Sequence, residues 1–154
     1  MYSTGTGTSL VWQRLLEGHC GIVRLLEEEY ANQKQVQMLI REGVLNSAHD
    51  LSEGGLWVGL LEKGFASGLG FDITLPAEHR KDAVLFGEAA SRILVTVSEE
   101  NKDKFIDLMM LNGCDFDLLG HVTKGAVRVD DEDWGHVSEY QEIYDNALGT
   151  ILSA

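Results

Sequence analysis

Residues 49–56, HDLSEGGL, combine residue types that could hold a magnesium-bound phosphate. The apolar run at 44–49 is typical of a buried strand, and Asp50 lies where the chain leaves that strand. Ser52 is expected at the N-cap of the next helix, with the Gly54-Gly55 pair in its first turn. A helix N-terminus attracts anions, and a neighbouring carboxylate can ligate Mg²⁺, which bridges to phosphate oxygens. The pattern therefore predicts a metal ligand at Asp50 and phosphate contacts at Ser52 and the two glycines.

A purely structural turn explains the same residues. Asp50 and Ser52 would then only cap the helix, and Gly54 and Gly55 would let it approach the sheet closely. Glycine costs about 1 kcal/mol in a helix relative to alanine, which suggests either that some group approaches the backbone closely or that the φ angle is one that other residues resist. His49 could face a ligand or serve as a general base, but no nucleophile motif accompanies it, which favours a hydrogen-bonded structural role.

A second group of polar residues, Glu88, Ser91 and Arg92, precedes another apolar run and could face a ligand. Arginine suits phosphate because its guanidinium donates two parallel hydrogen bonds. An internal Glu88–Arg92 ion pair holding the turn explains these residues equally well. The acidic run at 130–133 lacks the pattern of a calcium loop and is expected to be a solvated turn.

Hydrophobic periodicity predicts an α/β (α+β) fold in which helices cover a mixed β-sheet. Residues 1–8 are expected to form a flexible N-terminal segment and residues 9–154 a single domain. The last helix is expected to bury Val137, Tyr140, Tyr144, Leu148 and Ile151. Helices are expected over 9–18, 25–42, 56–66, 82–88, 98–111 and 137–152, and strands over 44–49, 70–75, 92–97, 116–123 and 126–129, the last two joined as a hairpin.

Charge and composition narrow the classes of partner. The 154 residues carry a formal net charge of −13, which disfavours nucleic acid and anionic membranes as partners. The two cysteines, Cys20 and Cys114, are far apart, so neither a disulfide scaffold nor a zinc site is expected. No apolar run approaches membrane-spanning length, and the first residues do not resemble a signal peptide.

Two motifs in order resemble a known family. HDxSxGGL at 49–56 resembles a hallmark of the C-terminal domains of the aminoimidazole ribonucleotide synthetase superfamily. Residues 85–92, LFGEAASR, resemble a segment of formylglycinamidine ribonucleotide synthetases, with Ala89 where that family usually has serine. Residues 39–48 and 117–122 resemble the same family, and the likeness extends from about residue 9 to residue 152.

The resemblance implies an identity and a role. Family members convert formylglycinamide ribonucleotide, ATP and glutamine to the amidine, ADP, phosphate and glutamate in purine biosynthesis. The chain resembles the last subdomain of the second of two pseudo-symmetric halves, which lacks the catalytic histidine, so the isolated domain is expected to be inactive. By motif, Asp50 would ligate Mg²⁺ and Ser52 would contact ATP or ADP at an auxiliary site, with weak or absent binding in isolation.

The resemblance also implies partners, namely the remaining domains of the same synthetase and a glutaminase subunit or domain, in the cytoplasm. If the C-terminus of this sequence is native, the lack of a glutaminase region after residue 152 is expected to favour the smaller, multi-subunit form of the enzyme. Two alternatives remain open. The chain could be the matching domain of a relative, of the aminoimidazole ribonucleotide synthetase, selenophosphate synthetase or thiamine-monophosphate kinase type, or a free-standing interaction module.

Overall fold

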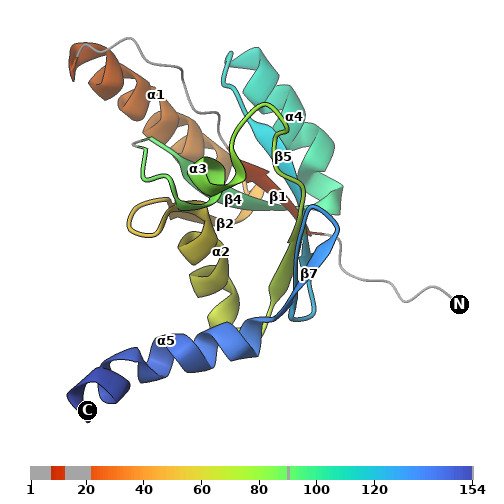
Figure 1. The fold of residues 1–154 in the computed structure, drawn as a ribbon. Helices are drawn as coiled ribbons and strands as arrows, with labels where there is room; N and C mark the ends of the chain where they lie inside the picture. Colours follow the sequence, from red (N-terminus) through yellow and green to blue (C-terminus); the bar gives the residue numbers. More distant parts are fainter. Residues whose placement is uncertain (1–7, 13–21, 90, 154) are drawn as a thin grey trace, which may run out of the picture.

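The computed structural model describes residues 8–12, 22–89 and 91–153, with side chains described from Tyr30 onward (Figure 1). The mixed sheet layered with helices that the sequence predicts is confirmed. The elements in chain order are β1 (Thr8–Trp12), α1 (Ile22–Arg41), β2 (Leu45–Asp50), α2 (Gly55–Phe65), β3 (Gly70–Ile73), α3 (Lys81–Phe86), β4 (Ile93–Ser98), a 3₁₀ turn (Glu99–Asn101), α4 (Lys102–Leu111), β5 (Asp117–Thr123), β6 (Ala126–Val129), β7 (Glu132–His136) and α5 (Val137–Leu152).

One seven-stranded sheet organises the described chain, with strand order β2-β4-β1-β5-β3-β6-β7. The β3–β6 pair is parallel and the other neighbouring pairs are antiparallel. Side chains of β4 alternate between two hydrophobic clusters, because Leu94 joins one and Val95 and Val97 join the other. Both faces of the sheet are therefore covered, as the nearly continuous apolar run of this strand predicts.

The two clusters assign the helices to opposite faces. Phe105 and Met109 of α4 pack with Leu39 of α1 on one face. Leu56 and Leu60 of α2 pack on the other face, together with residues of α3 and the sheet. Figure 1 shows α1 and α4 at one end of the molecule and α2 near its middle, between β2 and α5. The beginning of α2 is thus held between the sheet and α3, which is where the HDLSEGGL motif lies.

The close packing of α2 depends on glycine, and this yields a first prediction. A Cβ at Gly64 would lie 2.1 Å from the carbonyl oxygen of Leu69, which is backbone and cannot rotate away. Gly64→Ala should therefore lower the free energy of unfolding by about 1–3 kcal/mol, although alanine is normally the better helix former. Gly149→Ala in α5 is the control, because nothing lies within 4 Å of its added Cβ. Urea unfolding followed by circular dichroism should show a loss for the first variant and none for the second, and equal midpoints would contradict the packing argument.

Three predicted elements are wrong. Residues 9–12 belong to strand β1, paired with β4 and β5, and not to a helix, whereas residues 13–18 of that expected helix lie outside the described residues. The expected hairpin between β5 and β6 does not form, because β3 lies between those two strands. The acidic run at 130–133 is not simply a loop, since Glu132 and Asp133 begin β7 and Asp130 accepts a hydrogen bond from the Leu75 amide. Except for Thr8, the predicted flexible segment at 1–8 is outside the described residues.

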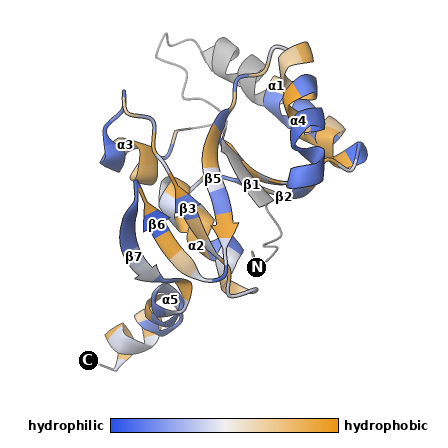
Figure 2. Cartoon of the chain, turned by 90° about the vertical axis from the view of Figure 1, so that its right-hand side faces the viewer, coloured by the Kyte–Doolittle hydropathy of each residue, from blue (hydrophilic) through white to orange (hydrophobic). Residues whose placement is uncertain are grey.

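Helix α5 has the predicted bounds but not the predicted burial. Val137 is fully buried and Tyr140 is half-buried, whereas Tyr144, Leu148 and Ile151 are 56%, 74% and 73% exposed. Figures 1 and 2 show the reason, because the helix runs away from the sheet toward the C-terminus. Among the described residues, no helix is long and apolar enough to cross a membrane.

Candidate functional site

The predicted metal ligand, Asp50, ends strand β2 at the edge of the sheet. It lies opposite Ile93 of β4 and its side chain is exposed. Leu51 is buried directly after it, and its amide donates a hydrogen bond to the Arg92 carbonyl. Ser52 is exposed. The strand–Asp–turn–helix corner therefore exists as the sequence predicts, and both polar side chains can be reached from solvent.

Ser52 does not cap α2, which corrects the expected helix start. The N-cap is Gly54, in the left-handed region at φ 77°, and no side chain caps the helix there. Gly55 follows at φ 63°. The contact at Ser52 is instead between backbone groups, because the Gly55 amide donates to the Ser52 carbonyl at 3.1 Å. Two successive positive φ angles explain why both positions are glycine.

A carboxylate of the chain itself occupies the start of α2. The Gly54 amide donates to Glu88 Oε1 at 2.9 Å, so Glu88 lies where the sequence predicts a phosphate. A negative charge is favourable there because the unpaired amides and the helix dipole leave partial positive charge at a helix N-terminus. A phosphate at this place would have to displace Glu88. The Gly54 amide at the start of α2 is therefore already hydrogen-bonded to a side chain of the same protein.

Gly55 permits the close contact between α2 and the end of α3. A Cβ at this position would lie 2.7 Å from the Gly87 carbonyl oxygen and 2.8 Å from that of Leu85. Both contacts are to backbone, so no side-chain rotation would relieve them. The glycine thus serves the close packing that the structural explanation of the motif requires.

Arg92 faces inward and does not pair with Glu88. Arg92 is only 2% exposed. Its guanidinium donates hydrogen bonds to the carbonyl oxygens of Gly87 at 2.9 Å and Val84 at 3.3 Å. Burial lowers the pKa of Arg92. The ion pair between Arg92 and Glu88 that the sequence suggested is not among the ion pairs of the described residues, and the predicted contact of Arg92 with a ligand stays a prediction. The guanidinium instead holds the carbonyl end of α3.

Ser91 has the left-handed φ of 66°, which is uncommon for a residue with a side chain. Its carbonyl accepts a hydrogen bond from Asn32 of α1 at 3.2 Å, and its hydroxyl is buried without a hydrogen-bond partner among the described residues. Its predicted contact with a ligand stays a prediction.

His49 links three elements and does not face a nucleophile. Its ring packs against α2, where a Cβ at Gly59 would meet it at 3.4 Å, and its Nε2 lies 3.8 Å from a Glu62 carboxylate oxygen. The other oxygen of Glu62 accepts a hydrogen bond from the Tyr144 hydroxyl at 3.1 Å, which raises the pKa of Tyr144. This series of contacts joins β2, α2 and α5, and a contact of His49 with a ligand stays a prediction.

The corner supplies few side chains that could ligate a magnesium ion. Within the described ranges, no group of three or more histidine, cysteine, aspartate or glutamate side chains could hold a metal ion. Mg²⁺ is commonly bound through one or two carboxylates, with waters and phosphate oxygens completing its octahedron. The exposed Asp50 carboxylate fits one such position, and the Ser52 hydroxyl fits a phosphate or water contact. The magnesium and phosphate contacts at Asp50 and Ser52 stay predictions.

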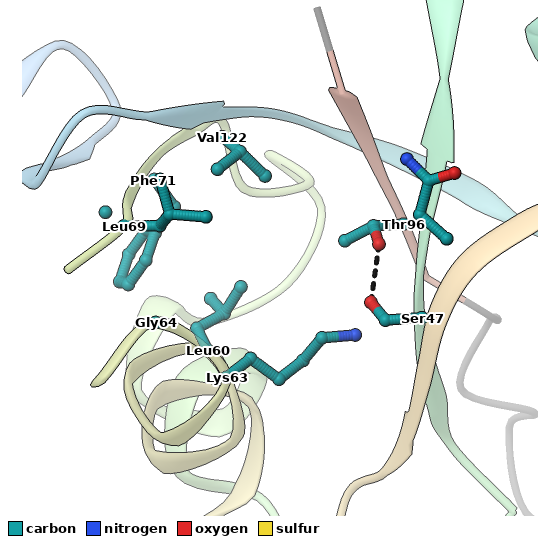
Figure 3. A pocket seen from close by; sticks show the side chains of 10 residues that line it. Ser47, Leu60, Lys63, Gly64, Leu69, Phe71, Thr96 and Val122 are labelled. Atoms are coloured by element: carbon teal, nitrogen blue, oxygen red, sulfur yellow. Dashed lines mark hydrogen bonds between the residues drawn. The ribbon is translucent and has the colours of Figure 1, made fainter. Parts of the chain in front are cut away.

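A pocket of about 220 Å³ lies away from this corner, and the sequence analysis missed it. Figure 3 shows the Lys63 side chain reaching from α2 toward a hydrogen bond of 2.5 Å between the hydroxyls of Ser47 and Thr96. Burial lowers the pKa of Lys63 to about 8. The available signal was a lysine that follows the apolar pair Leu60-Leu61 and the acidic Glu62 in the run LLEKGF. The lining residues are Asn46, Ser47, Leu60, Lys63, Gly64, Leu69, Gly70, Phe71, Thr96 and Val122.

Comparison of the sequence with known proteins gives consistent matches. Residues 3–132 match the family model described as AIR synthase related protein, C-terminal domain. A phosphoribosylformylglycinamidine synthase subunit PurL from Salinibacter ruber is 47% identical over 107 residues, covering 68% of this chain. The same subunit from Alkaliphilus metalliredigens is 34% identical over 130 residues, covering 79% of the chain. The chain spans only 14% and 17% of the lengths of these relatives.

Solved structures share the fold. The T. maritima PurL complexed with ATP aligns with a TM-score of 0.67 and 16% identity, covering 89% of this chain and 26% of that one. E. coli HypE, a hydrogenase maturation protein, aligns with a TM-score of 0.61 and 20% identity, covering 82% of this chain and 47% of that one. Because the family model matches residues 3–132 of 154, the chain belongs to the AIR synthase related protein, C-terminal domain family.

Proposed function

We propose that this chain acts as the C-terminal domain of a phosphoribosylformylglycinamidine synthase subunit. The observation that carries the proposal is the 47% identity over 107 residues to the Salinibacter ruber subunit. The contacts of Glu88 with the Gly54 amide and of Arg92 with the Gly87 carbonyl support the proposal, because they bring the two motifs together at the start of α2 and the end of α3. In this role the domain completes the synthetase by packing against the rest of the protein.

The whole protein would be a cytoplasmic, ATP-dependent carbon–nitrogen ligase. It would convert formylglycinamide ribonucleotide to the amidine with nitrogen from glutamine, and a glutaminase subunit or domain would be its partner. Mg²⁺ with ATP or ADP would be its cofactors, and bound metal would neutralise phosphate charge. In this chain, Asp50 and Ser52 would hold such a group, with the other contacts supplied by neighbouring domains.

The isolated chain is proposed to be structural and not catalytic. Asp50 is a single exposed carboxylate, and Glu88 fills the amide site at the start of α2. The Nε2 atom of His49 lies 3.8 Å from a Glu62 carboxylate oxygen. A ligase needs its nucleophile, base and phosphate contacts held in one place, and these residues do not form such a group.

A domain exchange tests the proposed role. Replacing the matched segment of the Salinibacter ruber subunit with the corresponding residues of this chain should give a soluble protein that forms the amidine from formylglycinamide ribonucleotide, ATP and ammonia. The control is the same exchange with the matching segment of the Alkaliphilus metalliredigens subunit, which is 34% identical to this chain. If the control exchange is active and the soluble exchange with this chain is inactive, the proposal is wrong.

Calorimetry with Mg-ADP tests the corner itself. The 154-residue chain should bind Mg-ADP weakly or not at all, because Glu88 competes for the Gly54 amide and half of the site is missing. Glu88→Gln should raise the affinity, since it removes the negative charge beside the phosphate position. Asp50→Ala should abolish any binding that depends on Mg²⁺, whereas Asp107→Ala, at an exposed position on α4, should not. Strong binding that survives Asp50→Ala would contradict the assigned metal role.

A further inference from the structure

The pocket between α2 and the sheet has an apolar side and a polar side. Leu60, Leu69, Phe71 and Val122 form the apolar side, and Figure 3 shows them across the pocket from the Ser47–Thr96 pair. Its volume of about 220 Å³ exceeds the roughly 150 Å³ that is enough for a benzene ring in a protein core. The pocket is therefore large enough for one ring or a short alkyl chain with a polar head.

The polar side presents hydrogen-bond donors and no described acid. Lys63 Nζ donates to the Leu94 carbonyl at 3.3 Å, which uses one of its three protons. Among the residues that the structure describes, no carboxylate lies within ion-pair distance of Lys63. The Ser47–Thr96 hydrogen bond uses one of the two hydroxyl protons and leaves the other available. Two ammonium protons and one hydroxyl proton are thus available on the same side of the pocket.

The charge of these donors selects the ligand. A half-buried ammonium that has no counter-charge among the described residues carries a desolvation cost, which lowers the pKa of Lys63. A ligand with a single negative charge would offset that cost. A dianion such as phosphate would keep one uncompensated negative charge, which is unfavourable in a chain of net charge −13. The apolar side requires that the rest of the ligand be hydrocarbon.

We propose that this pocket binds a small monocarboxylate whose apolar body contacts Leu60, Phe71 and Val122 and whose carboxylate pairs with Lys63 and one of the Ser47–Thr96 hydroxyls. The site is separate from the Asp50 corner, because Ser47 and Asp50 are three residues apart on β2, or about 10 Å. It does not depend on the proposed function, and its test does not use a nucleotide.

Titration of the 154-residue chain with benzoate, benzamide and inorganic phosphate, followed by calorimetry and by amide NMR shifts, tests the proposal. Benzoate should bind and shift residues of β2, α2 and β4. Benzamide has the same shape without the charge and should bind at least tenfold more weakly, and phosphate should not bind in the pocket. Lys63→Met keeps the aliphatic stem and should reduce benzoate affinity at least tenfold. Lys104→Met removes one positive charge from an exposed pair with Glu42 and should leave the affinity unchanged.

The pH dependence gives a test that needs no variant. Benzoate affinity should be constant between pH 6 and 7.5 and then fall tenfold per pH unit above about 8, as the ammonium loses its proton. Benzamide binding should not change over this range. Absence of benzoate binding, equal affinity for benzoate and benzamide, equal affinity of Lys63→Met and the unaltered chain, or a flat pH profile would each overturn the proposal.

Discussion

Gly55→Ala should lower the free energy of unfolding by about 2–5 kcal/mol, measured as a fall in the urea midpoint. Two costs add. A residue with a side chain at φ 63° costs about 1–2 kcal/mol. The new Cβ would also meet the backbone carbonyls of Gly87 and Leu85 at 2.7 and 2.8 Å, and forced overpacking costs about 1–3 kcal/mol.

Gly43→Ala separates these two costs. Gly43 has nearly the same φ, 65°, but nothing lies within 4 Å of an added Cβ. We expect this variant to lose only the conformational part, about 1–2 kcal/mol. If both variants lose the same stability, the contact between α2 and α3 does not contribute, and the explanation of Gly55 by close packing is wrong.

Arg92→Met should lower the free energy of unfolding by about 2–4 kcal/mol without involving any ligand. The guanidinium donates to the Gly87 and Val84 carbonyls, and methionine would leave both acceptors unpaired next to the buried cluster. A buried polar group left without a hydrogen bond lowers the free energy of unfolding by about 1–3 kcal/mol. Removal of the buried guanidinium charge offsets part of this loss.

Arg80→Met is the matched control for Arg92. Arg80 pairs with Asp82 on the surface, with 83% of its side chain exposed, so its loss should leave the urea midpoint within error. An Arg92→Met variant as stable as the unaltered chain would mean that the carbonyls of α3 find other donors. Loss of a ligand-dependent property at full stability would instead favour the ligand contact that the sequence suggested.

The elements with a strong local signal could be predicted from the sequence. Helix α5 has the predicted bounds, and β2, α2 and β4 lie within a few residues of the expected ranges. Their signals are local, being apolar periodicity and the glycines that end or begin a helix. The burial of α5 failed because periodicity identifies an apolar stripe but not whether another element covers it.

The missed elements depend on partners distant in the sequence. Leu10 and Val11 form too short an apolar run to distinguish a helix from a strand, and pairing with β4 and β5 decides the outcome. Lys124 and Gly125 look like a hairpin turn, yet β3 inserts between the two strands they join. The placement of Glu88 at the Gly54 amide likewise joins residues 34 positions apart, and no spacing rule predicts it.

The position of β1 inside the sheet determines the order in which the domain can assemble. Thr8 lies opposite Ser98 and Ser9 opposite His121, so the first strand of the domain has pairing partners only in its later half. During synthesis on the ribosome, β1 must therefore wait unpaired until β4 and β5 have emerged. Such long-range pairing slows folding and prolongs the exposure of unpaired strand edges to aggregation. We therefore expect nascent chains of this domain to be more prone to aggregation before β5 has been translated than after it.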